Sequence, residues 1–181
     1  MKSLIPQWHA DHVHFSRLLD LLERQVEAFR DDGEPDYNLM LDAIAYLREY
    51  GDRAHHPLED AAFERLAQRA PELRVPTNRL KQEHRVIARA GEELAKLLRD
   101  IIGDAVVARA RVEAAAALYL FYYRHHLATE ERVILPRAAS LLDAHDWKAI
   151  GKSASTQPDP LFGAVTAAGF RNLRNALAQT A

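Results

Sequence analysis

The chain has 181 residues, no cysteine and a formal net charge of −2. A length of this order favours one domain, and the lack of cysteine excludes disulfides, thiolate catalysis, zinc–thiolate sites and cysteine-held iron–sulfur clusters. The near-neutral charge gives no reason to expect nucleic acid or a membrane surface as partner. With only 7 glycines and abundant alanine, leucine, arginine and glutamate, the composition favours an α-helical protein.

Helix breakers divide the chain into four long predicted helices. The first is expected to end at residues 31–35, where Asp-Asp-Gly-Glu-Pro interrupts the pattern, and the second at residues 70–76, which contain two prolines. Gly103 and Asp104 form a short break before the fourth helix, with Asp104 as its predicted N-cap. Pro136 lies near the end of that helix. These breaks predict an all-α, antiparallel four-helix bundle.

The bundle is expected to occupy residues 1–150, with a separate segment at 151–181. Residues 151–159 have the composition of a polar linker, and Asp159 is a candidate N-cap for a short amphipathic helix over 160–177. We expect this helix to pack on its own bundle; packing on a second copy of the chain, as a homodimer, is the alternative.

The N-terminus has no long apolar run that would serve as a signal peptide, and no segment long enough to span a membrane follows it. We therefore expect a cytoplasmic protein with no membrane and no nucleic-acid partner.

Apolar side chains recur every three or four residues in each predicted helix, and a histidine occupies one core position in each. These four histidines are His12, His55, His84 and His126. At about 100° per residue, Glu59 stays on the face of His55, whereas His56 and Asp60 point roughly the opposite way. Pro57 is expected to kink this helix.

The apolar stripe of the fourth helix is predicted to run through Val112, Ala115, Tyr119, Tyr122 and His126. Tyr119 and Tyr122 are expected to line the site as packing residues, together with Trp8 from the first helix. Tyr122, one turn before His126, is also a candidate to offer its hydroxyl to a bound oxygen species.

The histidines belong to a repeated pattern of one histidine followed by a His-x-x-x-Glu motif. The first copy is His12 with His55 and Glu59, and the second lies 71 or 72 positions later. The second copy consists of His84, His126 and Glu130. The repeat predicts two equivalent half-sites.

Metal ions would explain two glutamates on buried faces. A single histidine in a core stripe is usually a packing residue, but unpaired buried carboxylates cost several kcal/mol each, and no lysine or arginine lies close to Glu59 and Glu130 on the predicted stripes. Two carboxylates that bridge two ions would hold them roughly 3.5–4 Å apart. Mixed nitrogen and oxygen ligands suit iron or manganese, with zinc as a further candidate. The open positions would accept dioxygen, nitric oxide, peroxide or solvent.

Over about residues 4–150, the chain resembles the hemerythrin-like, or HHE cation-binding, family. The resemblance is carried by four motifs, which are Asp11-His12, His55-His56-Pro57-Leu58-Glu59-Asp60, Glu83-His84 and His126-Leu-Ala-Thr-Glu130-Glu131. It implies an up-down-up-down four-helix bundle and a non-haem centre of two iron ions, in which an oxo or hydroxo group can bridge the ions. The ligands that it implies are His12, His55, Glu59, His84, His126 and Glu130.

The resemblance also bears on function. Oxygen-carrying hemerythrins generally use a fifth histidine four residues from the one on the third helix, and Leu80 and Ala88 fill those places here. The ligand set looks more like the branch linked to iron–sulfur repair and nitric-oxide stress, although members of that branch often carry a cysteine-containing N-terminal region.

Several functions therefore stay open. The first is a di-iron protein that binds or senses dioxygen or nitric oxide; the alternatives are a di-iron enzyme acting on peroxide or nitric oxide, or an iron donor in iron–sulfur cluster repair. A ferritin-like oxidase is disfavoured because that class uses Glu-x-x-His pairs, which are absent here. A purely structural bundle is the simplest alternative.

Other polar residues near the motifs have two interpretations. The four carboxylates next to predicted ligands either accept hydrogen bonds from ligand imidazoles or are ordinary exposed helix residues; they are Asp11, Asp60, Glu83 and Glu131. His9 and His14 are expected to be solvated or to support the ligands. His56 and His125 are expected to point outward, and His145 to have a structural role.

Overall fold

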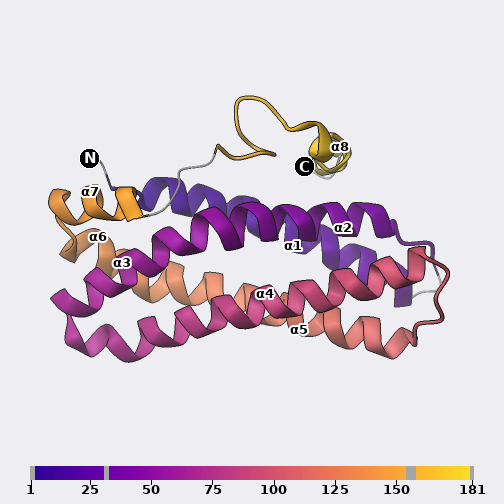
Figure 1. Ribbon diagram of the computed structural model, residues 1–181, viewed down its shortest axis with the longest axis horizontal. Helices are drawn as coiled ribbons and strands as arrows, with labels where there is room; N and C mark the ends of the chain where they lie inside the picture. Colours follow the sequence, from indigo (N-terminus) through magenta and orange to yellow (C-terminus); the bar gives the residue numbers. More distant parts are fainter. Residues whose placement is uncertain (1–2, 31–32, 154–157, 180–181) are drawn as a thin grey trace.

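The computed structural model describes residues 3–30, 33–153 and 158–179. Within these ranges the chain is helical and contains no strand, and Figure 1 shows the long helices side by side along the longest axis of the molecule. An all-α fold is therefore confirmed. In the same ranges, we find no helix that combines the length and the hydropathy needed to span a bilayer.

The helices fall into four long rods and a C-terminal part. The first rod is α1 (Ile5–Arg30) and the third is α4 (Arg74–Ile102), which follows a 3₁₀ turn, η2 (Pro71–Leu73). The second rod joins three segments without a break, which are α2 (Tyr37–Tyr46), the π-helix η1 (Leu47–His55) and α3 (His56–Arg69). The fourth rod does the same, with α5 (Arg109–Thr129), the π-helix η3 (Glu130–Ile134) and α6 (Leu135–Leu141).

The C-terminal part is less regular than the sequence predicts. It consists of α7 (Ala144–Ser153), a 3₁₀ turn η4 (Ala168–Phe170) and α8 (Arg171–Gln179). The expected linker at 151–159 is wrong at its start, because α7 continues through Ser153; its residues 154–157 lie outside the described ranges. The expected helix over 160–177 begins only at Arg171. The side chain of Asp159 accepts two backbone hydrogen bonds as a cap would, but they close a turn.

The predicted N-cap of the fourth helix is also wrong. Asp104 lies at the end of α4 with a positive φ of 61°, and the backbone N–H of Ala105 donates to the carbonyl of Asp100 at 2.9 Å. Aspartate tolerates this left-handed conformation, which closes the last turn of a helix. The break is therefore longer than the sequence indicated, because α5 begins only at Arg109.

Both π-helices end two residues before a proline. η1 ends at His55, before Pro57, and η3 ends at Ile134, before Pro136. Proline has no N–H, and its ring clashes with the carbonyl four residues earlier in a regular helix. A wider i→i+5 turn moves that carbonyl away and keeps the rod continuous. The irregularity expected at Pro57 is therefore a π-helical turn that ends at the candidate ligand His55.

The apolar core has two parts along the rods. One contains Phe15 and Ile87 and extends toward η4 and α8, and the other contains Trp8 and Leu80 and extends toward α7. On α1, His12 lies between Trp8 and Phe15, and His84 lies between the corresponding residues of α4. A polar layer thus separates two apolar regions, and both hold its side chains in place.

Candidate metal centre

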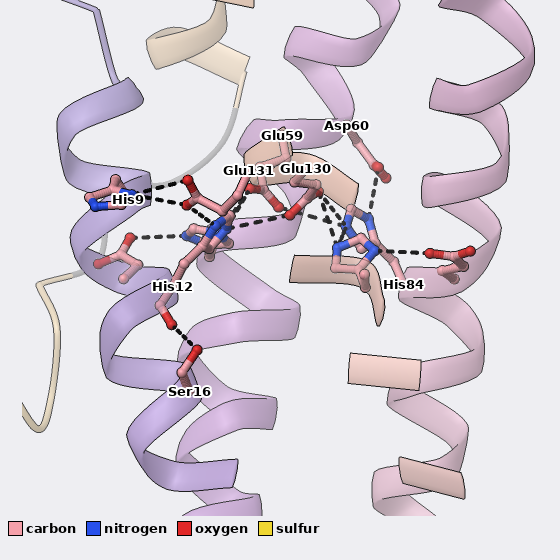
Figure 2. Close-up of polar contacts among 12 residues, drawn as sticks. His9, His12, Ser16, Glu59, Asp60, His84, Glu130 and Glu131 are labelled. Carbon is pink, nitrogen blue, oxygen red and sulfur yellow. Dashed lines mark hydrogen bonds and ion pairs between the residues drawn. The ribbon is translucent and has the colours of Figure 1, made fainter. Parts of the chain in front are cut away.

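The polar layer brings together all six residues that the sequence singled out. They come from the four rods and are buried, with at most 7% of each residue exposed; they are His12, His55, Glu59, His84, His126 and Glu130. Figure 2 shows the side chains of four of them, His12, Glu59, His84 and Glu130, meeting in the space between the rods.

The four imidazoles form two close pairs. The Nε2 atoms of His12 and His55 lie 3.1 Å apart, and those of His84 and His126 lie 3.0 Å apart. Two nitrogens that each lie about 2.1 Å from the same ion, at neighbouring positions of its coordination shell, are separated by a similar distance. Each pair combines a lone histidine with the histidine of a His-x-x-x-Glu motif, as the repeat predicted.

Each glutamate divides its two oxygens between the two histidine pairs. Oε1 of Glu59 lies 3.0 Å from Nε2 of His55, while its Oε2 faces Nε2 of His84 at 3.7 Å. Glu130 contacts the same two pairs from the other side. Its Oε1 lies 3.1 Å from Nε2 of His126, and its Oε2 lies 3.4 Å from Nε2 of His12. Both carboxylates therefore span the gap between the pairs, which is the position of a bridging ligand.

The Nδ1 atoms point away from the centre, and each faces a carboxylate on another rod. Asp11 lies 2.9 Å from His55, Asp60 lies 2.9 Å from His84, and Glu131 lies 2.7 Å from His12. The fourth contact is longer: an oxygen of Glu83 lies 3.4 Å from His126 and forms an ion pair without hydrogen-bond alignment.

These four contacts close a ring around the bundle. The first rod supplies His12 and, through Asp11, supports the histidine of the second rod; the second supports the third, the third the fourth, and the fourth supports His12 through Glu131. Each supporting carboxylate is adjacent in sequence to a candidate ligand. Of the two interpretations of Asp11, Asp60, Glu83 and Glu131, the contacts favour the one in which these carboxylates face imidazoles of the polar layer.

The ring of carboxylates decides the tautomer of a neutral imidazole. A carboxylate accepts a hydrogen bond, so Nδ1 carries the proton and Nε2 presents a lone pair. Without a metal ion, one Nε2 of each pair must carry a proton and donate it to the other Nε2 across about 3 Å, beside two carboxylates. A divalent ion between the paired nitrogens takes the place of this proton, because both Nε2 atoms then present a lone pair to it. The residues thus fit metal ions.

The pKa values of the histidines in the metal-free site also indicate that the layer favours cations. Burial alone would lower the pKa of His55, but the charges of Glu59 and Asp11 outweigh it and raise that pKa to about 10. For His126, burial is likewise outweighed by Glu130, and the pKa rises to about 10. The carboxylates of the layer therefore favour positive charge strongly, and they keep protons on these histidines when no metal ion is bound.

No lysine or arginine supplies that charge within the described ranges. The ion pairs of Glu59 and Glu130 there are all with histidine. Oε2 of Glu59 and both oxygens of Glu130 are buried without a hydrogen-bond partner, which is costly unless a cation compensates.

The prediction that His56 points outward is wrong. Its side chain is buried, and its ring stacks on that of His84 with centroids 4.0 Å apart. Nδ1 of His56 lies 3.3 Å from Asp52 without hydrogen-bond alignment. The prediction assumed 100° per residue, whereas the π-helical turn that ends at His55 changes that rotation. Burial, together with the neighbouring His84, holds the pKa of His56 well below its usual range, so this ring is neutral.

The remaining histidines lie farther from the centre. His125 is exposed, as expected. His9 is also exposed and shares Glu131 with His12, its Nδ1 lying 3.0 Å from that carboxylate. His14 is half-buried and stacks on Phe162, with ring centroids 3.8 Å apart. His145 lies on the surface, where its backbone N–H donates to Asp143.

The sequence selected the wrong tyrosine on α5. Tyr122 is only partly buried, whereas Tyr123 is fully buried with its ring centroid 6.0 Å from that of His56. The Tyr123 hydroxyl has no hydrogen-bond partner in the described part of the chain. The stripe likewise passes through Ala116 rather than Ala115. Tyr119 and Trp8 are buried as predicted.

The family model described as hemerythrin HHE cation binding domain matches residues 3–138. This range contains the first three rods, the fourth rod as far as the middle of α6, and all six candidate ligands. The chain belongs to the hemerythrin HHE cation-binding family. Membership, with the histidine and glutamate cluster of the polar layer, supports cation binding by this hemerythrin-like domain. A search of curated proteins finds no match.

Proposed function

We propose that this hemerythrin-like chain is a non-haem di-iron protein that binds or senses a small diatomic ligand, dioxygen or nitric oxide. The observation that carries the proposal is the arrangement of the two glutamates, because each divides its oxygens between two histidine pairs. In this proposal the four rods form an up-down-up-down bundle whose polar layer holds the two ions.

The number of protein ligands per ion leaves room for an external ligand. One ion would take His12 and His55, the other His84 and His126, and each would take one oxygen from each of the two glutamates. Four protein ligands are fewer than the six of an octahedral ion, so each ion keeps open positions. Nitrogen and oxygen donors without a thiolate suit iron or manganese, and the family resemblance favours iron.

A groove supports access for a small ligand. It lies along α1 and the fourth rod, has a volume of about 540 Å³, and is lined by His12 together with Val13, Leu127 and Ala128. Glu131, which holds Nδ1 of His12, also lines it. The charged residues Arg17, Asp20 and Arg124 line it as well, and the groove leads from the surface to one candidate ligand.

The proposal predicts two iron ions per chain in the purified protein. His55→Ala and Glu130→Ala each remove a central donor, and we expect either variant to lose most of this iron, as measured by metal analysis after gel filtration. The matched control is His125→Ala, which changes an exposed histidine next to a ligand and should keep both ions. Two ions retained in both test variants would refute the site.

Ligand binding is tested separately on the loaded protein. The optical spectrum of the reduced protein is recorded without oxygen, then after dioxygen or nitric oxide is added and removed. A reversible spectral change is expected for binding or sensing. Continued consumption of the added molecule would instead indicate an enzyme, and rapid loss of iron to an acceptor would indicate a donor.

A further inference from the structure

The buried His56 ring is the strongest unexplained feature beside the polar layer. Neither of its ring nitrogens has a hydrogen-bond partner among the described residues, although only 3% of the residue is exposed. An imidazole in this position loses its contacts with water and gains none in return. A nitrogen of His56 nevertheless lies within 4.8 Å of donor atoms of Glu59, His84 and His126.

His56 breaks the symmetry of the two half-sites. His126 lies 71 residues after His55, and the residue 71 positions after His56 is Leu127. Leu127 is a buried apolar residue that belongs to the core. The pair of His84 and His126 therefore has a third imidazole beside it, whereas a leucine stands at the equivalent place in the other half-site.

We infer that His56 is a fifth nitrogen donor, which binds the ion between His84 and His126. This rests on the proposed function, and it requires one adjustment. The ring of His56 stacks parallel to that of His84, with 9° between the planes, so both cannot point at one ion. Rotation about the Cβ–Cγ bond, a soft torsion in histidine, turns a nitrogen of His56 toward the ion.

The distances show that the movement required is short. Donors that lie about 2.1 Å from one ion are separated by roughly 3 to 4 Å, and the nitrogen of His56 is already within 4.8 Å of its partners. No hydrogen bond of the ring has to be broken, because it forms none. Asp52, whose Oδ1 lies 3.3 Å from Nδ1 of His56, then accepts the Nδ1 proton, as the other supporting carboxylates do.

The two metal positions are then unequal. One ion has three imidazoles and the other has two, so the first equivalent of metal goes to the His84–His126 position. The absent histidine near Leu80 or Ala88 is thus replaced from the second rod. During loading, a chain holding a single ion at the His84–His126 position is therefore expected to exceed the statistical fraction that two equal, independent positions would give.

The test is an anaerobic titration of the metal-free full-length protein with Co²⁺, followed by calorimetry and by the paramagnetically shifted imidazole N–H resonances. The wild type should bind in two steps, with three shifted imidazole resonances after the first equivalent. His56→Leu, which copies Leu127 of the other half-site, should weaken the first step at least tenfold and leave two such resonances. His125→Leu is the matched control and should behave as wild type.

The outcomes separate the two proposals. If His56→Leu still binds two ions with the two wild-type affinities, the inference fails while the proposed function stands. The inference also fails if the substitution changes nitric-oxide binding but neither of the two metal affinities. If the wild type binds fewer than two ions, the proposed function itself fails. Circular dichroism checks the fold of His56→Leu, and His56→Gln, which keeps a polar side chain of similar size, replaces it if that variant does not fold.

Discussion

Asp11 shows how a single residue beside the centre controls a candidate ligand. It is buried and accepts a hydrogen bond from Nδ1 of His55 at 2.9 Å, while the hydroxyl of Tyr50 donates to it more weakly at 3.4 Å. A carboxylate in this position fixes the tautomer and orientation of the imidazole and makes Nε2 a stronger donor.

Asp11→Asn removes the charge but keeps the shape of the side chain. We expect metal affinity to fall about tenfold to a hundredfold, as is typical when such a partner is lost, with the helical content unchanged. Competition with a chelator of known affinity measures this. Glu49→Gln, an exposed carboxylate on the second rod, is the control. Equal affinities for both variants would contradict a supporting role for Asp11.

At this scale the sequence predicts the candidate site well, because its residues obey local geometry. His12, His55, His84 and His126 were selected by a periodicity that regular helices preserve. The partners of the four carboxylates were not predicted, since each one pairs with a histidine of a different rod. Adjacency in sequence shows that a carboxylate lies near the polar layer, but only the packing of the rods decides which imidazole it contacts.

The π-helical turns are where prediction from the sequence fails at the scale of the element. From the sequence, Pro57 predicts a kink, and a helical projection with constant rotation through it places His56 on the outer face. On α5 the stripe was one residue out of register and selected Tyr122 in place of Tyr123. Only the first error is explained by a π-helix, because His56 directly follows η1. The α5 stripe lies in a regular α-helix, where steps of three and four residues fit both registers.

Gly51, in the middle of η1, reveals how closely this irregular turn packs against α5. Its backbone is not in the left-handed region, so the glycine is needed for space. A Cβ at this position would lie 2.8 Å from the hydroxyl of Tyr123, and the next nearest atom belongs to Phe15 at 3.9 Å. The hydroxyl alone therefore limits the size of residue 51.

The effect of Gly51→Ala on the free energy of unfolding should therefore depend on whether residue 123 is tyrosine or phenylalanine. In the wild type, overpacking should lower the free energy of unfolding by about 1–3 kcal/mol, despite a helix-propensity gain of about 1 kcal/mol. In a Tyr123→Phe background the clash is gone, and the same change should be neutral or stabilising. Urea denaturation of the two single variants and the double variant gives the coupling. Additive effects would show that the two residues do not touch.

The whole molecule consists of a polar layer held between two apolar regions, and the C-terminal segment at 161–177 completes one of them. Leu161, Phe170, Leu173 and Leu177 are buried in the same cluster as the core residues of α1 and α2. Packing of this segment on its own bundle is thus confirmed, and Figure 1 shows α8 beside α2 on one side of the rods. The amphipathic pattern predicted this packing, but not the length of the helix that provides it.

The position of this segment suggests that it stabilises the bundle without supplying any part of the metal site. Leu173 is fully buried, so Leu173→Ala should cost about 2–5 kcal/mol through lost contacts and the cavity left behind. We expect denaturation of the loaded protein to show this loss while two ions per chain are retained, because the six candidate ligands lie on the four rods. Leu118→Ala, which truncates a half-exposed leucine of α5, should cost under about 0.5 kcal/mol. Iron lost from folded Leu173→Ala would mean that the C-terminal part also positions the ligands, through the side chains of α1 and α2 on which it packs.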